Sequence, residues 1–249
     1  MDNTVLTVDG LKAAYASKQV LHGLNIDVRK AETYGLIGLN GAGKTTLIKI
    51  LLGLKDETSG DIAIFGQGRT DKSVKSEISY LPERFDPPWF LTGGEFIKFS
   101  AELYGRQVDR VVMEEYAVSL ALDPAVLSRK VQTYSKGMRQ KLGLIATILT
   151  GCSILILDEP MSGLDPLARA LVKNILLKVK GEGRTIILSS HILADMDEIC
   201  DRISVIHNGI IHFAGTPSGF KEEMGEASLE QSFLHIVARE AAMSDRSAA

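Results

Sequence analysis

Short runs of apolar, mostly β-branched residues recur along the chain, and segments with helical spacing of apolar residues lie between them. Such runs, bounded by Gly, Pro, Asn or Asp, predict buried β-strands. The predicted strands are residues 5–8, 24–28, 33–37, 61–65, 78–81, 154–157, 185–189, 203–207 and 210–213. Strands that alternate with helices predict an α/β fold with a mainly parallel sheet.

The strand pattern stops between about residues 85 and 148. Here apolar residues follow one another at three- and four-residue steps, as Phe96, Phe99 and Leu103 do, which is the spacing of one helix face. We therefore expect an inserted helical subdomain over 85–148, within a core lobe formed by 1–84 and 149–215.

The C-terminal part carries two local indications of structure. Asn208-Gly209, between the last two predicted strands, is typical of a two-residue hairpin turn. Thr216-Pro217 is typical of a helix start, because Thr caps the helix and Pro fits its first position. We expect C-terminal helices over 216–240, completing a single domain over 1–240, and a disordered tail over 241–249.

Composition limits the possible partners and compartments. Lys and Arg number 28 and Asp and Glu number 31, so the net charge is −3, whereas a nucleic-acid-binding domain usually carries a basic excess. Two cysteines, Cys152 and Cys200, fit small buried residues in a reducing cytoplasm. The longest apolar run, around 154–157, is far shorter than the ~20 residues that cross a bilayer. We expect a cytoplasmic protein without a nucleic-acid partner.

The strongest chemical indication is the stretch Gly38-Leu39-Asn40-Gly41-Ala42-Gly43-Lys44-Thr45-Thr46. It follows a predicted strand and opens a predicted helix, as a phosphate-binding loop does. Its glycines let backbone N–H groups turn toward phosphate oxygens, and the helix adds the positive end of its dipole. Lys44 is expected at the β- and γ-phosphates, and the Thr45 hydroxyl at Mg²⁺. The sequence thus predicts that 40–46 bind a nucleoside triphosphate.

Two acids, Asp158 and Glu159, directly follow the apolar run 154–157. A buried strand that ends this way places both carboxylates at the carboxyl edge of the sheet, where open α/β sheets bind ligands. Asp158 would hold Mg²⁺ through its water shell, and Glu159 would lie where water attacks the γ-phosphate. A solvated acidic turn is the alternative for these two residues alone.

Two further motifs, Ser162-Gly163-Leu164-Asp165 and Ser189-Ser190-His191, follow in order. With them the chain, from about residue 5 to 239, resembles the ATP-binding subunit of an ABC transporter. The resemblance implies a P-loop NTPase core of ABC-ATPase type, with an N-terminal antiparallel β part and an inserted α-helical subdomain. It also implies hydrolysis of ATP with Mg²⁺, in which Lys44, Glu159 and His191 are catalytic.

The resemblance assigns the remaining site residues. Tyr15 matches the aromatic residue that stacks on adenine, and Val20 lines the ribose. Ser135 and Gly137, in the signature loop Tyr134-Ser135-Lys136-Gly137-Met138, face the γ-phosphate held by a second subunit. Asp165 and His191 match the acid that communicates between sites and the switch histidine. Taken singly, a tyrosine such as Tyr15 is more often a half-buried surface aromatic, and a histidine after a strand, such as His191, is more often an ordinary loop residue with its hydrogen bonds satisfied.

The resemblance further implies two partners. One is a second ATPase subunit, expected to be another copy of this chain, which closes head to tail on two ATP molecules. The other is a separate membrane-spanning permease, which would hold the protein at the cytoplasmic face of the membrane. The alternatives are a soluble ABC-type ATPase that acts on ribosomes or DNA, and a regulatory module that binds ATP without hydrolysing it.

Two positions depart from the commonest family pattern. Lys136 stands where a glycine is usual, and could face solvent or add charge near the anion. Glu83 stands where the family usually has the glutamine that reaches Mg²⁺ and the attacking water. Both variants resemble the branch that serves ABC-2 type exporters, which favours export.

The segment after Glu83 contains Trp89, the only tryptophan, and Phe90 next to two prolines. Prolines at these positions exclude a regular helix, so we expect a loop. Its aromatic residues either complete the core of the helical subdomain or line the groove that receives a helix of the membrane partner.

Overall fold

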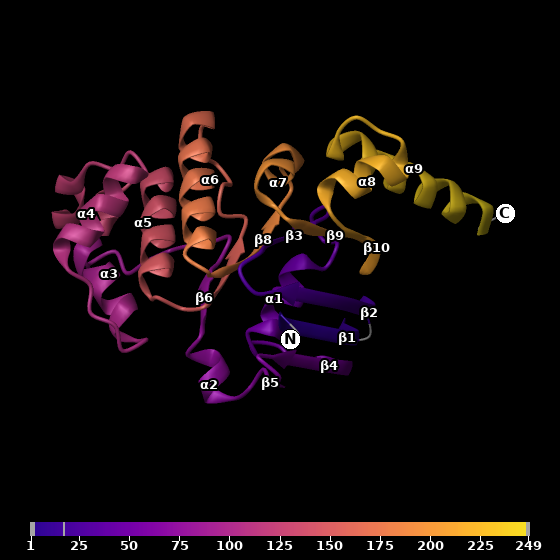
Figure 1. Ribbon diagram of the computed structural model, residues 1–249, viewed down its shortest axis with the longest axis horizontal. Helices are drawn as coiled ribbons and strands as arrows, with labels where there is room; N and C mark the ends of the chain where they lie inside the picture. Colours follow the sequence, from indigo (N-terminus) through magenta and orange to yellow (C-terminus); the bar gives the residue numbers. More distant parts are fainter. Residues whose placement is uncertain (1–2, 17, 248–249) are drawn as a thin grey trace. The chain divides into compact units, whose positions relative to one another are not determined.

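The computed structural model describes residues 3–16 and 18–247 in two compact units. Unit 1 consists of Met1–Asp71 and Ser189–Ala249, and unit 2 is Lys72–Leu188. In Figure 1 the indigo strands and the yellow C-terminal helices belong to unit 1, and the magenta helices belong to unit 2. No helix in these described ranges is both long and apolar enough to cross a membrane.

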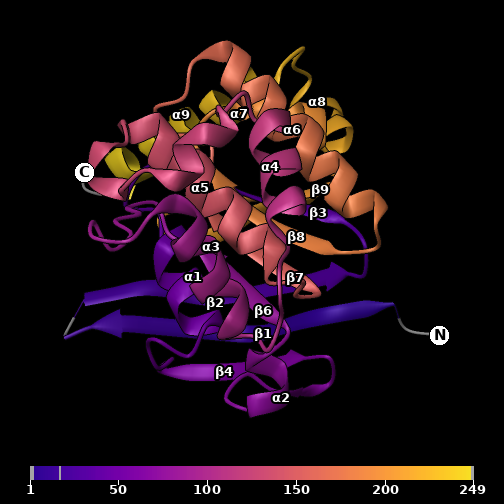
Figure 2. The same cartoon turned by 90° about the vertical axis from the view of Figure 1, so that its left-hand side faces the viewer.

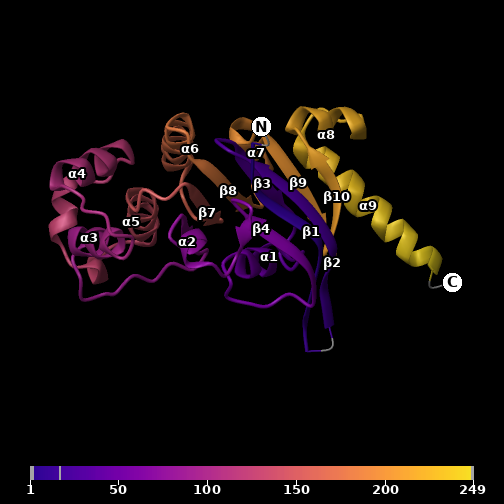
Figure 3. The same ribbon diagram turned by 60° about the horizontal axis from the view of Figure 1, so that its bottom comes forward.

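Unit 1 contains an antiparallel sheet with the strand order β2-β1-β4-β5. Its long central hairpin is β1 (Thr4–Tyr15) and β2 (Lys18–Arg29), joined by β4 (Ser59–Ile64) and the short β5 (Gln67–Gly68). Alternate residues of β2 are buried, namely Leu24, Ile26 and Val28, because successive side chains of a strand point to opposite faces. Figure 3 shows β1, β2 and β4 side by side.

A second group of strands in unit 1 carries the predicted phosphate-binding segment. Strand β3 (Thr33–Ile37) is buried along its whole length and pairs in parallel with β9 (Arg202–His207). Strand β9 turns at Asn208-Gly209 and pairs antiparallel with β10 (Ile210–Gly215), which confirms the predicted hairpin. Burial on both faces explains why β3 is a continuous apolar run rather than an alternating one.

The helices of unit 1 are α1 (Lys44–Leu51), α7 (Leu193–Ile199), α8 (Pro217–Met224) and α9 (Leu229–Ser247). The Thr216 side chain accepts a hydrogen bond from the Gly219 N–H (3.0 Å), so it caps α8 as predicted. Helix α9 continues through 241–247, where we expected a disordered tail, and 248–249 lie outside the described residues. No Pro or Gly interrupts this segment, and Ala241 and Ala242 have high helix propensity.

Unit 2 begins with α2 (Lys72–Lys75) and contains the parallel strands β6 (Ile78–Leu81) and β7 (Ile154–Asp158), with β8 (Thr185–Ser190) beside β7. The last residues of β8 belong to unit 1. The helices are α3 (Gly93–Glu102), α4 (Arg110–Ser119), α5 (Lys136–Leu149) and α6 (Pro166–Gly181), with short 3₁₀ turns η1 (Pro124–Ser128) and η2 (Val131–Thr133). Helices α3 and α4 both pack on α5 (Figure 2).

Every predicted strand is present, but several boundaries differ. Strands β1 and β2 extend well beyond the predicted 5–8 and 24–28, and β5 was not predicted. The helical segment predicted over 85–148 holds α3, α4 and α5, but it belongs to the larger unit Lys72–Leu188, which also includes β6 and β7. Periodicity identifies helices and strands, whereas unit boundaries depend on contacts that are distant in the sequence.

Helix α8 is anchored to unit 1 by Phe220, which is fully buried with its ring centroid 4.8 Å from that of Phe213 on β10. We expect Phe220→Ala to lower the free energy of unfolding by about 3–5 kcal/mol, because it leaves a cavity. The matched control is Leu234→Ala on α9, where the side chain is 63% exposed. It should change stability by less than about 0.5 kcal/mol. Urea denaturation followed by circular dichroism measures both, and equal effects would contradict the packing of α8.

Candidate functional site

The phosphate-binding segment lies in unit 1 between the end of β3 and the start of α1. Gly38 is closely packed, since a Cβ there would overlap the Ile206 carbonyl oxygen of β9. Gly43 has φ = 111°, a conformation that side chains disfavour, and caps the N-terminus of α1. The backbone therefore requires glycine at two positions of the predicted motif, which is the arrangement that brings N–H groups close to phosphate.

Lys44 is buried at the start of α1. Its ammonium donates hydrogen bonds to the carbonyl oxygens of Gly38 (2.6 Å) and Leu39 (3.3 Å). The ammonium is thus held on the loop itself, close to the glycine-rich backbone that would surround a phosphate. Thr45, the predicted magnesium ligand, is the next residue and is partly exposed.

The β9–β10 turn fixes the loop from outside the motif. The Gly209 N–H donates to the Ala42 carbonyl oxygen (3.1 Å), and the Gly209 carbonyl oxygen accepts from the His22 N–H of β2 (3.0 Å). The sequence predicted this hairpin turn but gave no indication that it supports the phosphate-binding segment. The contact joins residues more than 160 positions apart, which local patterns cannot reveal.

Val20 and Tyr15, the predicted ribose and adenine contacts, lie on the β1–β2 hairpin. The Val20 carbonyl oxygen is close to Gly43, since a Cβ built there would be 3.5 Å from it. Tyr15 is 47% exposed, and the Lys55 ammonium lies 4.1 Å from its ring centroid. One face of the ring is therefore engaged in a cation–π contact that the sequence did not predict.

His191, also in unit 1, follows β8 and is exposed. The turn behind it is fixed by Ser190, whose Oγ accepts a hydrogen bond from the Ile192 N–H (3.0 Å). Exposure directly after a buried strand leaves the imidazole accessible to a ligand.

The predicted acids lie in unit 2, at the carboxyl ends of β6 and β7. These strands are parallel, with Leu81 opposite Leu157, so Glu83 and Asp158 leave the same edge. Burial and the nearby negative charges of Asp158 and Glu83 raise the pKa of Tyr80 to about 12. Burial is the larger cause, and the negative charges of the two residues that follow the adjacent strands add to it.

Glu159 is buried and has φ = 53°, the left-handed region that non-glycine residues rarely adopt. The next residue is Pro160, and a residue before proline prefers an extended backbone. The Ser162 N–H donates to the Glu159 carbonyl oxygen (3.1 Å), which closes a turn. Backbone strain of this kind costs on the order of 1–3 kcal/mol and is common at functional sites. The solvated acidic turn that was the alternative does not fit, because Asp158 and Glu159 are both buried.

The signature segment opens α5 in unit 2. The exposed Ser135 is the N-cap of α5, and its Oγ accepts a hydrogen bond from the Met138 N–H (3.2 Å). The preceding Tyr134 is buried and donates its hydroxyl to the Val126 carbonyl oxygen (2.7 Å), and burial raises its pKa to about 12. Tyr134 thus anchors the segment that opens α5, and the first N–H groups of α5 lie at the positive end of the helix dipole.

Asp165 begins α6 as its N-cap, with its carboxylate accepting from the Ala168 N–H (2.9 Å). This capping role accounts for an aspartate before Pro166 without any further function.

Within the described residues, no three His, Cys, Asp or Glu side chains form a group suited to a metal ion. Such a group is not required for Mg²⁺, which commonly takes one or two carboxylates together with substrate phosphates and water.

The aromatic segment after Glu83 divides into buried and exposed parts. Phe85 packs edge-on against Phe96 (5.5 Å between ring centroids) and lines a cavity of about 130 Å³ with Leu103 and Gly143. Trp89 and Phe90 are 66% and 55% exposed. The interpretation that Trp89 and Phe90 complete the core is therefore wrong, because the prolines carry the chain outward after Phe85.

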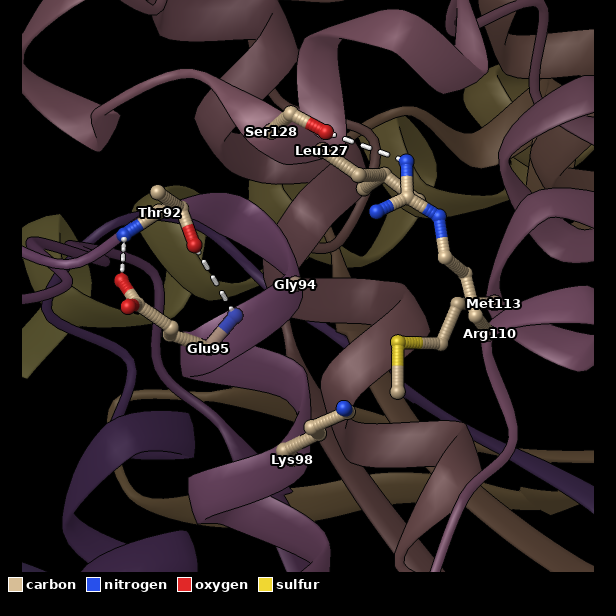
Figure 4. Close-up of a pocket in the computed structure, with 8 residues that line it drawn as sticks. All are labelled: Thr92, Gly94, Glu95, Lys98, Arg110, Met113, Leu127 and Ser128. Atoms are coloured by element: carbon tan, nitrogen blue, oxygen red, sulfur yellow. Dashed lines mark hydrogen bonds between the residues drawn. The ribbon is translucent and has the colours of Figure 1, made fainter.

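A larger cavity of about 300 Å³ lies in unit 2 among α3, α4 and η1 (Figure 4). Lys98 and Arg110 line it, but Arg110 is engaged with Glu114 (2.7 Å) and Ser128 (3.0 Å). On the other side, the Glu95 carboxylate and the Thr92 backbone form a capping box. Opposite charges balance around this cavity, and none of the predicted site residues lines it.

A family model described as ABC transporter matches residues 21–162, which is more than half of the chain. The chain belongs to the ABC transporter family. Among solved structures, this chain is similar to the one titled "Structure of ATP binding subunit of ABC transporter". The TM-score is 0.85 and the sequence identity is 32%. The similarity covers 94% of this chain and 99% of that one. The predicted fold class, a P-loop ABC ATPase with α and β parts, is thereby confirmed.

Two relatives define how far the similarity extends. An uncharacterized ABC transporter ATP-binding protein of Synechocystis, sll0415, is 41% identical over 79% of this chain and 56% of its own length. The daunorubicin resistance ATP-binding protein DrrA3 of Streptomyces coeruleorubidus is 34% identical over 97% of this chain and 76% of its own length. The chain therefore spans little more than half of the first relative.

Because Gly38 is closely packed, Gly38→Ala tests directly whether the loop binds a nucleotide. We expect Gly38→Ala to weaken nucleotide binding by at least roughly tenfold, or about 1.4 kcal/mol, because the new Cβ displaces the loop from Ile206. Gly68→Ala is the control, since a Cβ there meets open space. Titration with a fluorescent ATP analogue measures both. Unchanged affinity of Gly38→Ala would show that the loop does not bind the nucleotide.

Proposed function

We propose that this chain is the ATP-hydrolysing subunit of an ABC transporter, which dimerises around two ATP molecules and drives export through a separate membrane-spanning partner. The observation that carries the proposal is the segment 38–45 of unit 1, where glycine is required sterically at Gly38 and conformationally at Gly43. Family membership supports ATP as the nucleotide.

In unit 1, the N–H groups of Asn40, Gly41 and Gly43 would surround the phosphates. The Ala42 N–H donates to the Leu39 carbonyl oxygen (3.1 Å) and so holds the loop in shape. The Lys44 ammonium would exchange its bonds to loop carbonyls for phosphate oxygens. Thr46 lies in the first turn of α1, whose dipole adds positive charge. Tyr15 would contact adenine with the ring face not engaged by Lys55, and Val20 would line the ribose. His191 would contact the γ-phosphate.

In unit 2, the shared edge of β6 and β7 supplies the acids. Asp158 and Glu83 are the Mg²⁺ ligands proposed for unit 2, and the Thr45 hydroxyl is the one proposed for unit 1. When bound, Mg²⁺ neutralises charge that develops on the phosphate oxygens.

Glu159 is the proposed general base. Phosphoryl transfer to water depends mainly on positioning and charge neutralisation, so the carboxylate must orient one water and accept its proton. Burial and the turn at φ = 53° restrict the carboxylate to few orientations, which supports this role. Since a hydrolysing site needs such a base, the presence of Glu159 also favours turnover over a purely regulatory ATP site.

Ser135 and Gly137 would face the γ-phosphate held by a second copy of the chain. The hydroxyl of Ser135 accepts a hydrogen bond from Met138, which leaves its own proton to donate to an anion. Asp165, in the loop after Glu159, would communicate between the two ATP sites of the dimer. Closure is favoured by contacts that exist only in the closed state, and hydrolysis removes them.

The exposed pair Trp89 and Phe90 would dock on a helix of the membrane partner, at the cytoplasmic face of the membrane. Large exposed aromatic side chains are typical of interaction sites. Export is favoured by Lys136 and Glu83, which resemble the ABC-2 branch, and by similarity to a protein named for daunorubicin resistance.

Glu159→Gln tests the base. We expect ATP binding to persist, hydrolysis to fall by about 10²–10⁴, and a closed dimer to accumulate with Mg-ATP. Phosphate release and light scattering provide the measurements, with Glu115→Gln on the exposed face of α4 as the control. Unaltered turnover of Glu159→Gln would refute the assignment.

Trp89→Ala tests the docking surface. We expect transport in reconstituted vesicles to be lost while basal ATPase and thermal stability stay unchanged, because the exposed ring contributes little to folding. Val111→Ala on α4 removes another exposed apolar side chain (65%) and should preserve transport. Wild-type transport in Trp89→Ala, or a large loss of its stability, would contradict the docking role.

A further inference from the structure

Gln140 is a buried polar residue in the second turn of α5, with 7% of its surface exposed. Its side-chain Nε2 donates a hydrogen bond of 3.1 Å to the carbonyl oxygen of Pro160. Pro160 is itself buried, so this bond satisfies a carbonyl group that is removed from water. The bond connects α5 to the turn that directly follows β7, and both lie in unit 2.

The turn that Gln140 contacts is the strained one. Glu159 adopts φ = 53° immediately before Pro160, a combination that local backbone preferences disfavour. Such a conformation persists only where the surrounding structure holds it. The bond from Ser162 to the Glu159 carbonyl closes the turn on one side, and the bond from Gln140 to the Pro160 carbonyl fixes it from the neighbouring helix.

The first turn of α5 contacts the same loop at two more places. The aliphatic stem and ammonium of Lys136 lie over Gly163, where a built Cβ would be 3.2 Å from the Lys136 Nζ. Gly137 lies beside Leu164, whose Cδ2 would be 3.6 Å from a Cβ at Gly137. Lys136, although exposed, thus extends along the loop after β7. The start of α5 and the loop 159–164 are therefore packed together along their length.

We propose that Gln140 is a positioning residue for Glu159. It does not touch the substrate; its amide holds the Pro160 carbonyl and thereby keeps the Glu159 backbone in the left-handed conformation that aims the carboxylate. This role rests on the proposed function of Glu159 as the general base. It also means that the helix carrying Ser135 and Gly137 and the turn carrying the base share one hydrogen bond.

The chemistry of the contact sets what each substitution does. A carbonyl oxygen only accepts hydrogen bonds, so the side chain at 140 must donate. Leucine fills a similar volume but donates nothing, and leaves the buried carbonyl of Pro160 unsatisfied. Glutamate is nearly isosteric with glutamine; it donates only when protonated, and when ionised it places negative charge against the carbonyl.

The experiment compares Gln140→Glu and Gln140→Leu with the wild-type protein in steady-state ATPase assays at pH 6 and pH 8. At pH 8 we expect kcat to fall roughly tenfold or more in both variants, with KM for ATP within about twofold, because misplacement of a reacting group affects the chemical step. At pH 6 the kcat of Gln140→Glu, relative to wild type at the same pH, should recover at least about threefold. Burial raises the pKa of a carboxyl group, so a larger fraction then donates.

Gln140→Leu should show no recovery at pH 6, since it has no titrating group. Gln132→Leu, in η2 just before α5, is the matched control, because the Gln132 side chain is exposed, and it should leave kcat unchanged at both pH values. Thermal melting confirms that each variant is folded. If Gln140→Leu does not fold, the relative recovery of the isosteric Gln140→Glu still decides the question.

Wild-type kcat in Gln140→Leu or in Gln140→Glu at pH 8 would overturn the proposal. Equal losses in Gln140→Glu at both pH values would also overturn it, since they would indicate packing rather than a donated hydrogen bond. Glu159→Gln, assayed in parallel, distinguishes failure of the positioning role of Gln140 from failure of Glu159 as the base. If Glu159→Gln retains turnover, the base assignment fails; if it is inactive while the Gln140 variants are normal, only the positioning role fails.

Discussion

Parallel pairing of buried strands is the constraint on which the rest of the structure depends. In a parallel pair, consecutive strands end at the same edge, so the residues that follow them are brought together without any contact between their side chains. In unit 2, β6 and β7 end side by side, and Glu83 and Asp158 leave that edge together. In unit 1, β3 pairs with β9, and the segments after these strands, 38–43 and Asn208-Gly209, are hydrogen bonded to each other. Each proposed catalytic residue follows a buried strand, and the packing of that strand determines where the residue lies.

The second requirement is that loops without regular hydrogen bonding must be held in unusual conformations. The phosphate-binding loop is held by Gly209 from the β9–β10 turn, and the Glu159 turn is held by Gln140 from α5. In both cases the supporting group bonds to a backbone carbonyl rather than to a side chain of the site. A carbonyl bond fixes the chain direction and leaves the functional side chain available for substrate, which is what preorganisation for catalysis requires.

The sequence predicted the strands and the motifs because both are local. Apolar runs locate β3, β6 and β7, and glycine spacing locates the phosphate-binding loop, since each depends on residues within about ten positions. Supporting residues could not be found in this way. Gln140 and Pro160 are 20 positions apart, and Gln140 looks like any polar residue in a helix until its burial is known. The exposure of Trp89 was equally open, because an aromatic residue next to prolines is compatible with a core position or a surface position.

Ser135 and Asp165 show why residue type alone could not assign the remaining roles. Both are helix N-caps, and Ser and Asp are among the preferred residues there whatever the helix does. The two side chains differ in the hydrogen bonds that they can still make while they cap a helix. A serine hydroxyl that accepts from Met138 still has a proton to donate, so Ser135 can bind an anion and cap α5 at once. A carboxylate has no proton to donate and repels an anion, so Asp165 is suited to N–H or cationic groups instead. Capping and function are therefore compatible at both positions, but only Ser135 has the chemistry to face a phosphate directly.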